Sequence, residues 1–240
     1  MSDRGPWTRA RGATRLAAAA QASLPGAGED GSLALRAIQL FVLVTLLSLA
    51  PAIAVMATCF PFMVTVLSIL RTAVGLQQSP PNMLIVSLAL FLTWFVMAPV
   101  FETAWAEGVV PLLEERVSLE TAAVNALGPF RAFMAARVDG DTLAALAEVA
   151  PRAADPGGET PLSVLAPAFL LSEIARAFEI GFLIYLPFLL IDLVAASILM
   201  SMGMMMVPPV VVSLPFKLAF FVVADGWSLL AGALVRGYGA

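Results

Sequence analysis

Long uncharged hydrophobic runs dominate the chain and predict helices that enter or cross a membrane. No charged residue stands between Ala37 and Leu70, between Met83 and Phe101, or between Leu193 and Phe216. These runs match or exceed the roughly 20 residues that a spanning helix needs. They lack the alternation of apolar and polar residues that is typical of barrel strands. The sequence therefore predicts an all-α integral membrane protein with four hydrophobic helical segments in hairpins.

Prolines and glycines divide the hydrophobic runs into shorter pieces. Pro51 and Pro61 can bend or end a helix, so we expect a first span near residues 38–57, followed by a second helical piece. The stretch from Gly203 to Pro209 combines backbone freedom with a proline pair. It therefore predicts the turn that joins the last two hydrophobic helices.

One region differs sharply from the rest in its charge. Residues 102–176 contain eleven acidic residues and five arginines, and their apolar residues recur at helical spacing. We expect this region to be an acidic, soluble helical insertion, and its charge favours the periplasmic side.

The chain therefore divides by composition into four regions. Residues 1–36 combine four early arginines, all within the first 15 residues, with Ala-rich and Gly/Pro-rich stretches and resemble a targeting or disordered leader, whose cleavage the sequence leaves open. Residues 37–101 carry the N-terminal hydrophobic helices and residues 102–176 the acidic insertion. Residues 177–240 carry the C-terminal hydrophobic helices and a methionine-rich loop.

Composition argues against several classes of function. Hydrophobic residues make up 60% of the chain and charged residues only 12%, which is far from the balance of a soluble domain. The single Cys59 and the absence of histidine argue against an intrachain disulfide, a zinc site and a catalytic triad. A net charge of −4 with one lysine does not suggest nucleic-acid binding, and the chain has no Walker nucleotide loop. We therefore predict that the protein is not an enzyme and that it has no catalytic residue, no metal and no cofactor.

Three charged residues in apolar surroundings need partners. Glu173 and Lys217 stand at the edges of apolar segments, where an unpaired charge costs several kcal/mol. By spacing alone, Glu173 would pair with Arg176 on the same helix face. Asp192 stands between two uncharged runs, and either a proton relay or a structural bond would explain it; we favour the structural bond.

Five methionines surround Gly203 just before Pro208 and Pro209: Met200, Met202, Met204, Met205 and Met206. Methionine side chains are unbranched and flexible, so a ring of them could seal a pore and yield to varied polypeptides. They could equally fill a lipid-facing or core surface. Composition alone favours the second interpretation.

Several stretches match, in order and at the expected separations, the sequence runs of one known family. They include LSILRTAVG at 67–75, QQSPPN at 77–82, PAFLLSE at 167–173, AFEIGFLIYLPF at 177–188, IDLVAAS at 191–197, MSMGMMM at 200–206 and SLPFK at 213–217. On these stretches, which span about residues 38–235, the chain resembles the FliP family of type III export gate subunits. One departure is at residues 58–63, where Phe62 stands in place of the arginine of the family pattern.

The resemblance implies a pore-forming subunit of the flagellar export gate, which conducts unfolded flagellar proteins across the bacterial inner membrane at the flagellar basal body. It implies a ring of about five copies that forms a helical pore complex with FliQ and FliR, and FlhB and FlhA as further partners. It also implies that Met204, Met205 and Met206 form the gate constriction, and that Glu173 and Lys217 form a salt bridge between adjacent subunits.

Other functions remain open at this point. The nearest is the homologous SctR-type subunit of a virulence secretion system, although the acidic insertion and the methionine run favour the flagellar branch. A small-ion or proton channel would use Asp192, Lys217 and Asp225. A scaffold that nucleates the basal body would never contact exported protein.

Overall fold

The computed structural model describes residues 55–75, 80–150, 160–204 and 206–239, together with residues 36–38, 40–42, 44, 45, 48, 49 and 53. These residues contain helices and turns but no strand, which confirms the predicted all-α class. The chain divides into two units, residues 1–51 and 52–240, and the second unit carries all the elements below. Almost all of the predicted leader lies outside the described residues.

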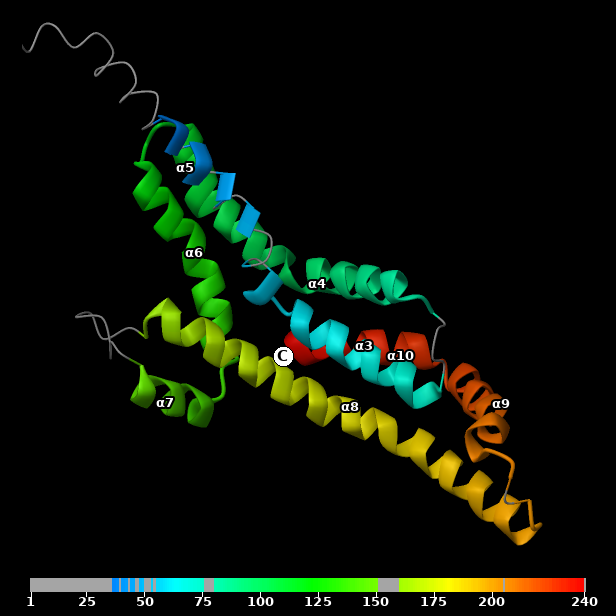
Figure 1. Ribbon diagram of the computed structural model, residues 1–240. Coiled ribbons are helices and arrows are strands. Elements are labelled where there is room, and N and C mark those ends of the chain that lie inside the picture. The colour runs from blue at the N-terminus through cyan, green and yellow to red at the C-terminus, as the bar shows by residue number, and fades with distance from the viewer. Residues whose placement is uncertain are drawn as a thin grey trace, which may run out of the picture. The chain divides into compact units, whose positions relative to one another are not determined.

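The second unit consists of α-helices and one short π-helical stretch, η1 (Figure 1). In chain order they are α3 (Phe60–Val74), α4 (Asn82–Ala104), η1 (Trp105–Val109), α5 (Val110–Leu113), α6 (Leu119–Ala135), α7 (Gly140–Val149), α8 (Leu162–Ser201), α9 (Pro209–Val223) and α10 (Gly226–Gly239). Pro61 lies in the first turn of α3, where its missing N–H would have no partner in the helix anyway.

Within the described residues, two helical runs are long and apolar enough to cross a membrane. They are Asn82–Leu113, which joins α4, η1 and α5, and Leu162–Ser201, which is α8. The bent pair of α9 and α10, with 62° between its two helices, could be a third. The helix α3 is also apolar, but its 15 residues are fewer than a bilayer core requires.

The predicted composition boundaries do not coincide with helix ends. The boundary at 101/102 lies inside α4, and the boundary at 176/177 lies inside α8, a single helix of 40 residues. Helical hydrogen bonds connect residues four apart and continue across a change in charge. The helix α8 is therefore about 60 Å long, roughly twice the thickness of a bilayer core, and joins the acidic insertion to the C-terminal hydrophobic region.

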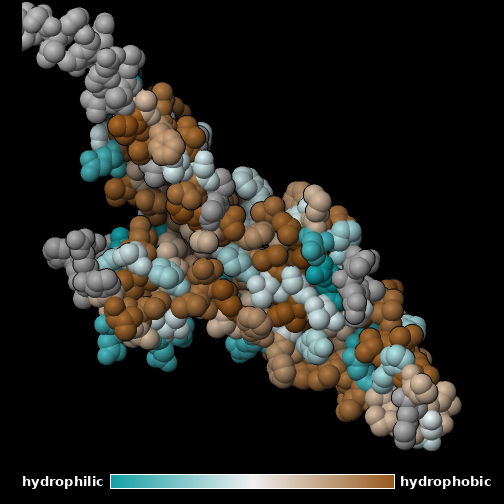
Figure 2. Space-filling model, in the orientation of Figure 1, coloured by the Kyte–Doolittle hydropathy of each residue, from teal (hydrophilic) through white to brown (hydrophobic). Residues whose placement is uncertain are grey.

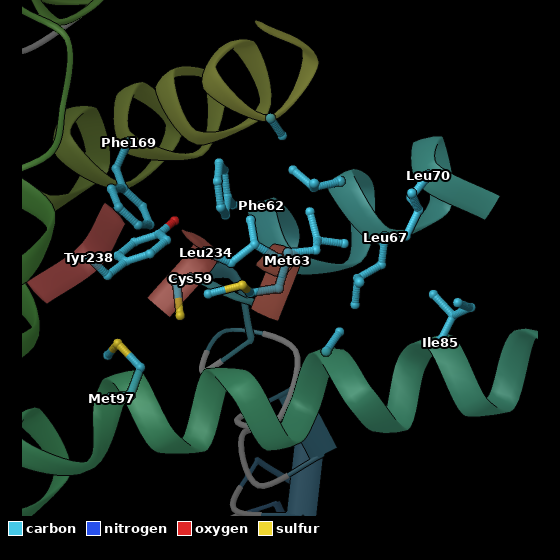
Figure 3. Close-up of a cluster of buried hydrophobic side chains, with 14 of the residues drawn as sticks. Cys59, Phe62, Met63, Leu67, Leu70, Ile85, Met97, Phe169, Leu234 and Tyr238 are labelled. Carbon is cyan, nitrogen blue, oxygen red and sulfur yellow. The ribbon is translucent and has the colours of Figure 1, made fainter. Parts of the chain in front are cut away.

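The core lies where α3 packs against α4, α8 and α10 (Figure 3). One face of α3 supplies Phe62, Met63, Val66, Leu67 and Leu70, all almost fully buried. Their spacing places them on one face of the helix. Packing of this face against the neighbouring helices therefore holds the short helix in place.

A glycine allows α3 and α8 to approach closely. A Cβ placed on Gly181 of α8 would lie 2.3 Å from the Cδ1 of Ile69 on α3, so a larger residue would clash there. The absence of a side chain at this position therefore sets the distance between the two helices.

Large apolar side chains cover much of the surface of this unit (Figure 2). Phe91 and Trp94 on α4, Phe182 and Leu190 on α8, and Phe216 on α9 are all exposed. Soluble monomers rarely expose contiguous apolar surface of this extent, because it favours association. The surface fits a protein that is embedded in a membrane.

Candidate functional site

The methionine turn, which we define as residues 202–208, joins α8 to α9. Met204 has an exposed fraction of 39% and Met206 of 98%, while Met205 lies outside the described residues. Met202 and the neighbouring Met200 at the end of α8 are exposed as well. The predicted turn is therefore confirmed, and the methionines described here do not fill the core of the chain.

Gly203 ends α8 through a left-handed backbone conformation. Its φ is 74°, a positive value that residues with a Cβ adopt only at a cost. The N–H of Gly203 donates to the carbonyl of Met200, and the N–H of Met204 donates to the carbonyl of Leu199. This pair of bonds is a Schellman motif, which satisfies the last carbonyls of the helix. Pro208 then precedes α9, so the turn has a defined beginning and end.

An apolar groove lies beside the methionine turn, between α8 and α9. Its volume is about 600 Å³, and Leu190, Ile198, Met202, Met204 and Phe216 are among the residues that line it. The methionine turn therefore continues into a hydrophobic surface that α8 and α9 leave open.

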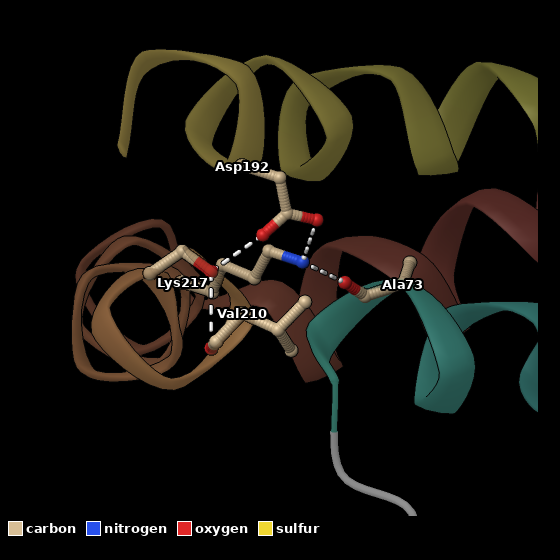
Figure 4. A network of polar contacts seen from close by, with 5 residues as sticks. Ala73, Asp192, Val210 and Lys217 are labelled. Atoms are coloured by element: carbon tan, nitrogen blue, oxygen red, sulfur yellow. Dashed lines mark hydrogen bonds and ion pairs between the residues drawn. The ribbon is translucent and has the colours of Figure 1, made fainter. Parts of the chain in front are cut away.

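A buried ion pair holds the base of this helical hairpin together (Figure 4). The Nζ of Lys217 on α9 lies 2.6 Å from the Oδ2 of Asp192 on α8. The same Nζ donates to the carbonyl of Ala73 at the end of α3, at 2.9 Å. The hydroxyl of Ser213 donates to the other oxygen of Asp192. These contacts tie α8, α9 and α3 together with almost no exposure of the lysine.

Glu173 lies in a different place, where α8 meets α10. Its exposed fraction is 0%, and its Oε2 accepts a hydrogen bond from the hydroxyl of Tyr238. Among the described residues its Oε1 has no hydrogen-bond partner. Arg176, the predicted local partner of Glu173, instead donates to the carbonyl of Gly237 at 3.0 Å.

Glu173 and Lys217 therefore do not pair with each other within the chain. Lys217 pairs with Asp192, and Glu173 bonds to Tyr238. Asp192 bonds to Lys217 and Ser213 of its own chain. A salt bridge between subunits needs a second copy, so it stays a prediction.

Two of these partners could have been sought in the sequence. Asp192 stands ten residues before Met202, and Lys217 stands nine residues after Pro208. Lone opposite charges at nearly equal distances from a turn will face each other across a helical hairpin. Tyr238 gave no such signal, because it approaches Glu173 only when α10 folds back onto α3 and α8.

These groups position helices and do not suggest catalysis or metal binding. No cluster of three metal-ligating side chains occurs in the part of the chain that the structure describes. The described features of interest are therefore a methionine turn, an apolar groove and two buried polar contacts.

Known proteins resemble this chain over most of its length. A family model described as the FliP family matches residues 43–234. The flagellar biosynthetic protein FliP of Caulobacter vibrioides is 54% identical over 215 residues, which are 88% of this chain and 80% of that protein. The protein of the same name from Agrobacterium fabrum is 48% identical over 212 residues, 87% of this chain and 86% of the relative. That of Bacillus subtilis is 44% identical over 203 residues, with shares of 84% and 91%.

Proposed function

Because this chain belongs to the FliP family of flagellar biosynthetic proteins, and is thus a membrane component of the flagellar export apparatus and not an enzyme, we propose that it forms the protein-conducting pore of that apparatus. About five copies, together with FliQ and FliR, surround a path for unfolded flagellar proteins through the inner membrane at the basal body. FlhB and FlhA are the further partners that we expect. The names of the relatives favour the flagellar branch over a virulence system.

The methionine turn is the observation that carries this proposal. It projects several flexible apolar side chains from the tip of the α8–α9 hairpin without packing them into the core. Thioether side chains adapt to irregular surfaces. A ring of such turns can therefore seal an empty pore and still make room for a polypeptide that passes through it. Met204, Met205 and Met206 are the residues that we propose for the constriction.

The exposed apolar surface supports assembly with further chains. Helices in a membrane associate through packing and polar contacts, since lipid is as apolar as their side chains. The groove between α8 and α9 offers such a packing surface beside the methionine turn. Copies arranged around an axis would bring their methionine turns together.

The salt bridge between Glu173 of one copy and Lys217 of the next is part of this proposal. Each residue is buried and has a partner within its own chain, so the bridge requires Lys217 to exchange Asp192 for Glu173 of a neighbour. Reversing both charges, with Glu173→Lys and Lys217→Glu, should then restore assembly that either single change abolishes. A double reversal that assembles no better than either single change would contradict the exchange.

The gate is tested by replacing Met204, Met205 and Met206 with Ala and measuring flagellin secretion together with the leak of small ions through the membrane. We expect a leak with retained or altered secretion. Unchanged secretion and a tight membrane would mean that the methionines are ordinary packing. A matched control is Met83→Ala, which removes an exposed methionine far from the turn in sequence.

A second measurement separates a conduit from a scaffold. A photoreactive residue placed at Met205 should crosslink to a secreted flagellar protein that is arrested during export, while the same group at Met83 should not. Crosslinks at neither position would favour a scaffold that exported protein never contacts.

A further inference from the structure

Tyr238 meets the buried carboxylate of Glu173 from the last turns of α10. Its hydroxyl donates to Oε2 of Glu173, and Tyr238 itself is buried. A carboxylate in such surroundings is costly unless donors satisfy it. In the described part of the chain, this hydroxyl is the only side-chain donor that bonds to it.

Aromatic rings fix the position of Tyr238 (Figure 3). The ring of Phe62 on α3 lies edge-on to the Tyr238 ring, with centroids 5.2 Å apart. The ring of Phe133 on α6 stacks against it at 6.3 Å. These ring contacts restrict the side chain of Tyr238, so its hydroxyl stays directed at Glu173.

Two arginines border this cluster, and both donate hydrogen bonds to backbone carbonyls of α10. Arg137 lies over the rings of Phe133 and Tyr238 and donates to the carbonyl of Tyr238. Arg176 donates to the carbonyl of Gly237 and lies 5.7 Å from the centroid of the Tyr238 ring. Neither arginine forms a salt bridge with Glu173 among the contacts of the described residues. The hydrogen bonds of both arginines therefore end at α10, and their charges act on Glu173 only through space. Among the described residues, the tyrosine is the side chain that donates to the acid.

Phe62 is the side chain of α3 that packs on Tyr238, the donor to Glu173. Its side chain is buried against Tyr238, and the guanidinium of Arg176 lies 5.9 Å from its ring centroid. A phenylalanine fills this space but has no donor. A longer basic side chain at the same position would bring a donor to the acid from α3, and the tyrosine hydroxyl would no longer be needed.

We propose that Tyr238 is a positioning residue for Glu173, and that Phe62 and Tyr238 form a matched pair. Tyr238 supplies from α10 the donor that a basic residue at position 62 would supply from α3. The same hydrogen bond anchors the end of α10 to α8. This pairing concerns how the chain holds its buried acid, and it stands whether or not the chain conducts exported protein.

The test begins with Tyr238→Phe, which removes the hydroxyl and keeps the ring. The deleted hydrogen bond goes to a buried acid, so its loss weakens the folded state and lowers the melting temperature. We therefore expect the purified, detergent-solubilised full chain to melt about 3–12 °C lower than the unchanged protein. Tyr185→Phe is the matched control, because it deletes the hydroxyl of the other tyrosine, which is only partly buried on α8.

The second variant, Phe62→Arg combined with Tyr238→Phe, should regain most of the lost melting temperature. If the Tyr238→Phe protein does not accumulate in membranes, its melting temperature cannot be measured. In that case the amount of full-length protein in membranes, measured by immunoblot, should rise again in the double variant. A double variant no better than Tyr238→Phe, or a Tyr238→Phe effect no larger than that of Tyr185→Phe, would overturn the proposal.

Glu173→Gln distinguishes this pairing from a purely steric effect. A glutamine oxygen still accepts from Tyr238, so we expect a drop of only a few degrees in the otherwise unchanged chain. In the Phe62→Arg, Tyr238→Phe background the same change leaves a buried arginine without its counter-charge, and the drop should be several times larger. An equal drop in both backgrounds would also overturn the matched pair.

Discussion

The buried pair of Asp192 and Lys217 makes a strong prediction about stability. The side chain of Lys217 has an exposed fraction of 4%, while that of Asp192 has 23%. Asp192→Asn therefore removes the counter-charge of a buried ammonium, which keeps its hydrogen bond to the carbonyl of Ala73 and has only a neutral amide oxygen in place of the carboxylate. Removing one partner of a buried pair costs about 3–5 kcal/mol.

The reverse change should cost less. Lys217→Met leaves Asp192 with its bond from Ser213 and with partial contact with solvent, so its charge is less isolated. Replacing both partners, with Asp192→Leu and Lys217→Met, removes both charges, and such replacements of buried pairs are often neutral. We expect stability to fall most for Asp192→Asn, less for Lys217→Met and least for the double replacement.

The measurement is the thermal unfolding of the purified chain in detergent. A loss of about 3–5 kcal/mol corresponds to roughly 6–20 °C in melting temperature for a chain of this length. Glu179→Gln removes an exposed acid from the same helix and should leave the melting temperature within about 2 °C. An Asp192→Asn chain that melts like Glu179→Gln, or a double replacement that melts below both single variants, would show that this ion pair does not stabilise the fold in the way proposed.

Three further predictions concern backbone geometry and helix capping. Gly203→Ala forces a Cβ into a left-handed backbone, and we expect a loss of about 1–2 kcal/mol in unfolding experiments, together with altered secretion. Gly181→Ala meets the side chain of Ile69 and should destabilise the chain by about 1–3 kcal/mol, with partial recovery on adding Ile69→Val; no recovery would mean that another contact matters. Hydrogen bonds from the backbone N–H and the hydroxyl of Thr142 lower the pKa of Asp139, the N-cap of α7. The stabilisation of α7 by the Asp139 cap is therefore fully present above the ordinary aspartate pKa and is lost as the pH falls through the lowered pKa of Asp139. Reduced protection of the α7 amides from exchange at low pH would show this loss. Asp139→Ala should lack this pH dependence.

Phe62 shows how a departure from a family pattern acquires a meaning in three dimensions. In the sequence, Phe62 stands where the family pattern has an arginine. In the structure, Phe62 packs on Tyr238, whose hydroxyl reaches Glu173. The buried acid therefore receives its hydrogen bond from Tyr238, without a cation at position 62.

The helical class, the hydrophobic runs and the turn after α8 can all be predicted from the amino-acid sequence. These features depend on local chemistry, because helical hydrogen bonds connect residues four apart and because Gly203 and the proline pair act on their own backbone. Charge and composition could not show where helices end, since α8 continues through the predicted boundary at 176/177.

Which polar groups meet depends on how the helices pack. Glu173 and Arg176 are close in sequence, yet Glu173 bonds to a tyrosine 65 residues away, and Arg176 bonds to the carbonyl of Gly237. In an apolar interior every charge must find a partner, but several arrangements of the same charges could satisfy that demand. The packing of α10 onto α3 and α8 selects one of them, because it places the ring of Tyr238 and its hydroxyl beside the buried acid.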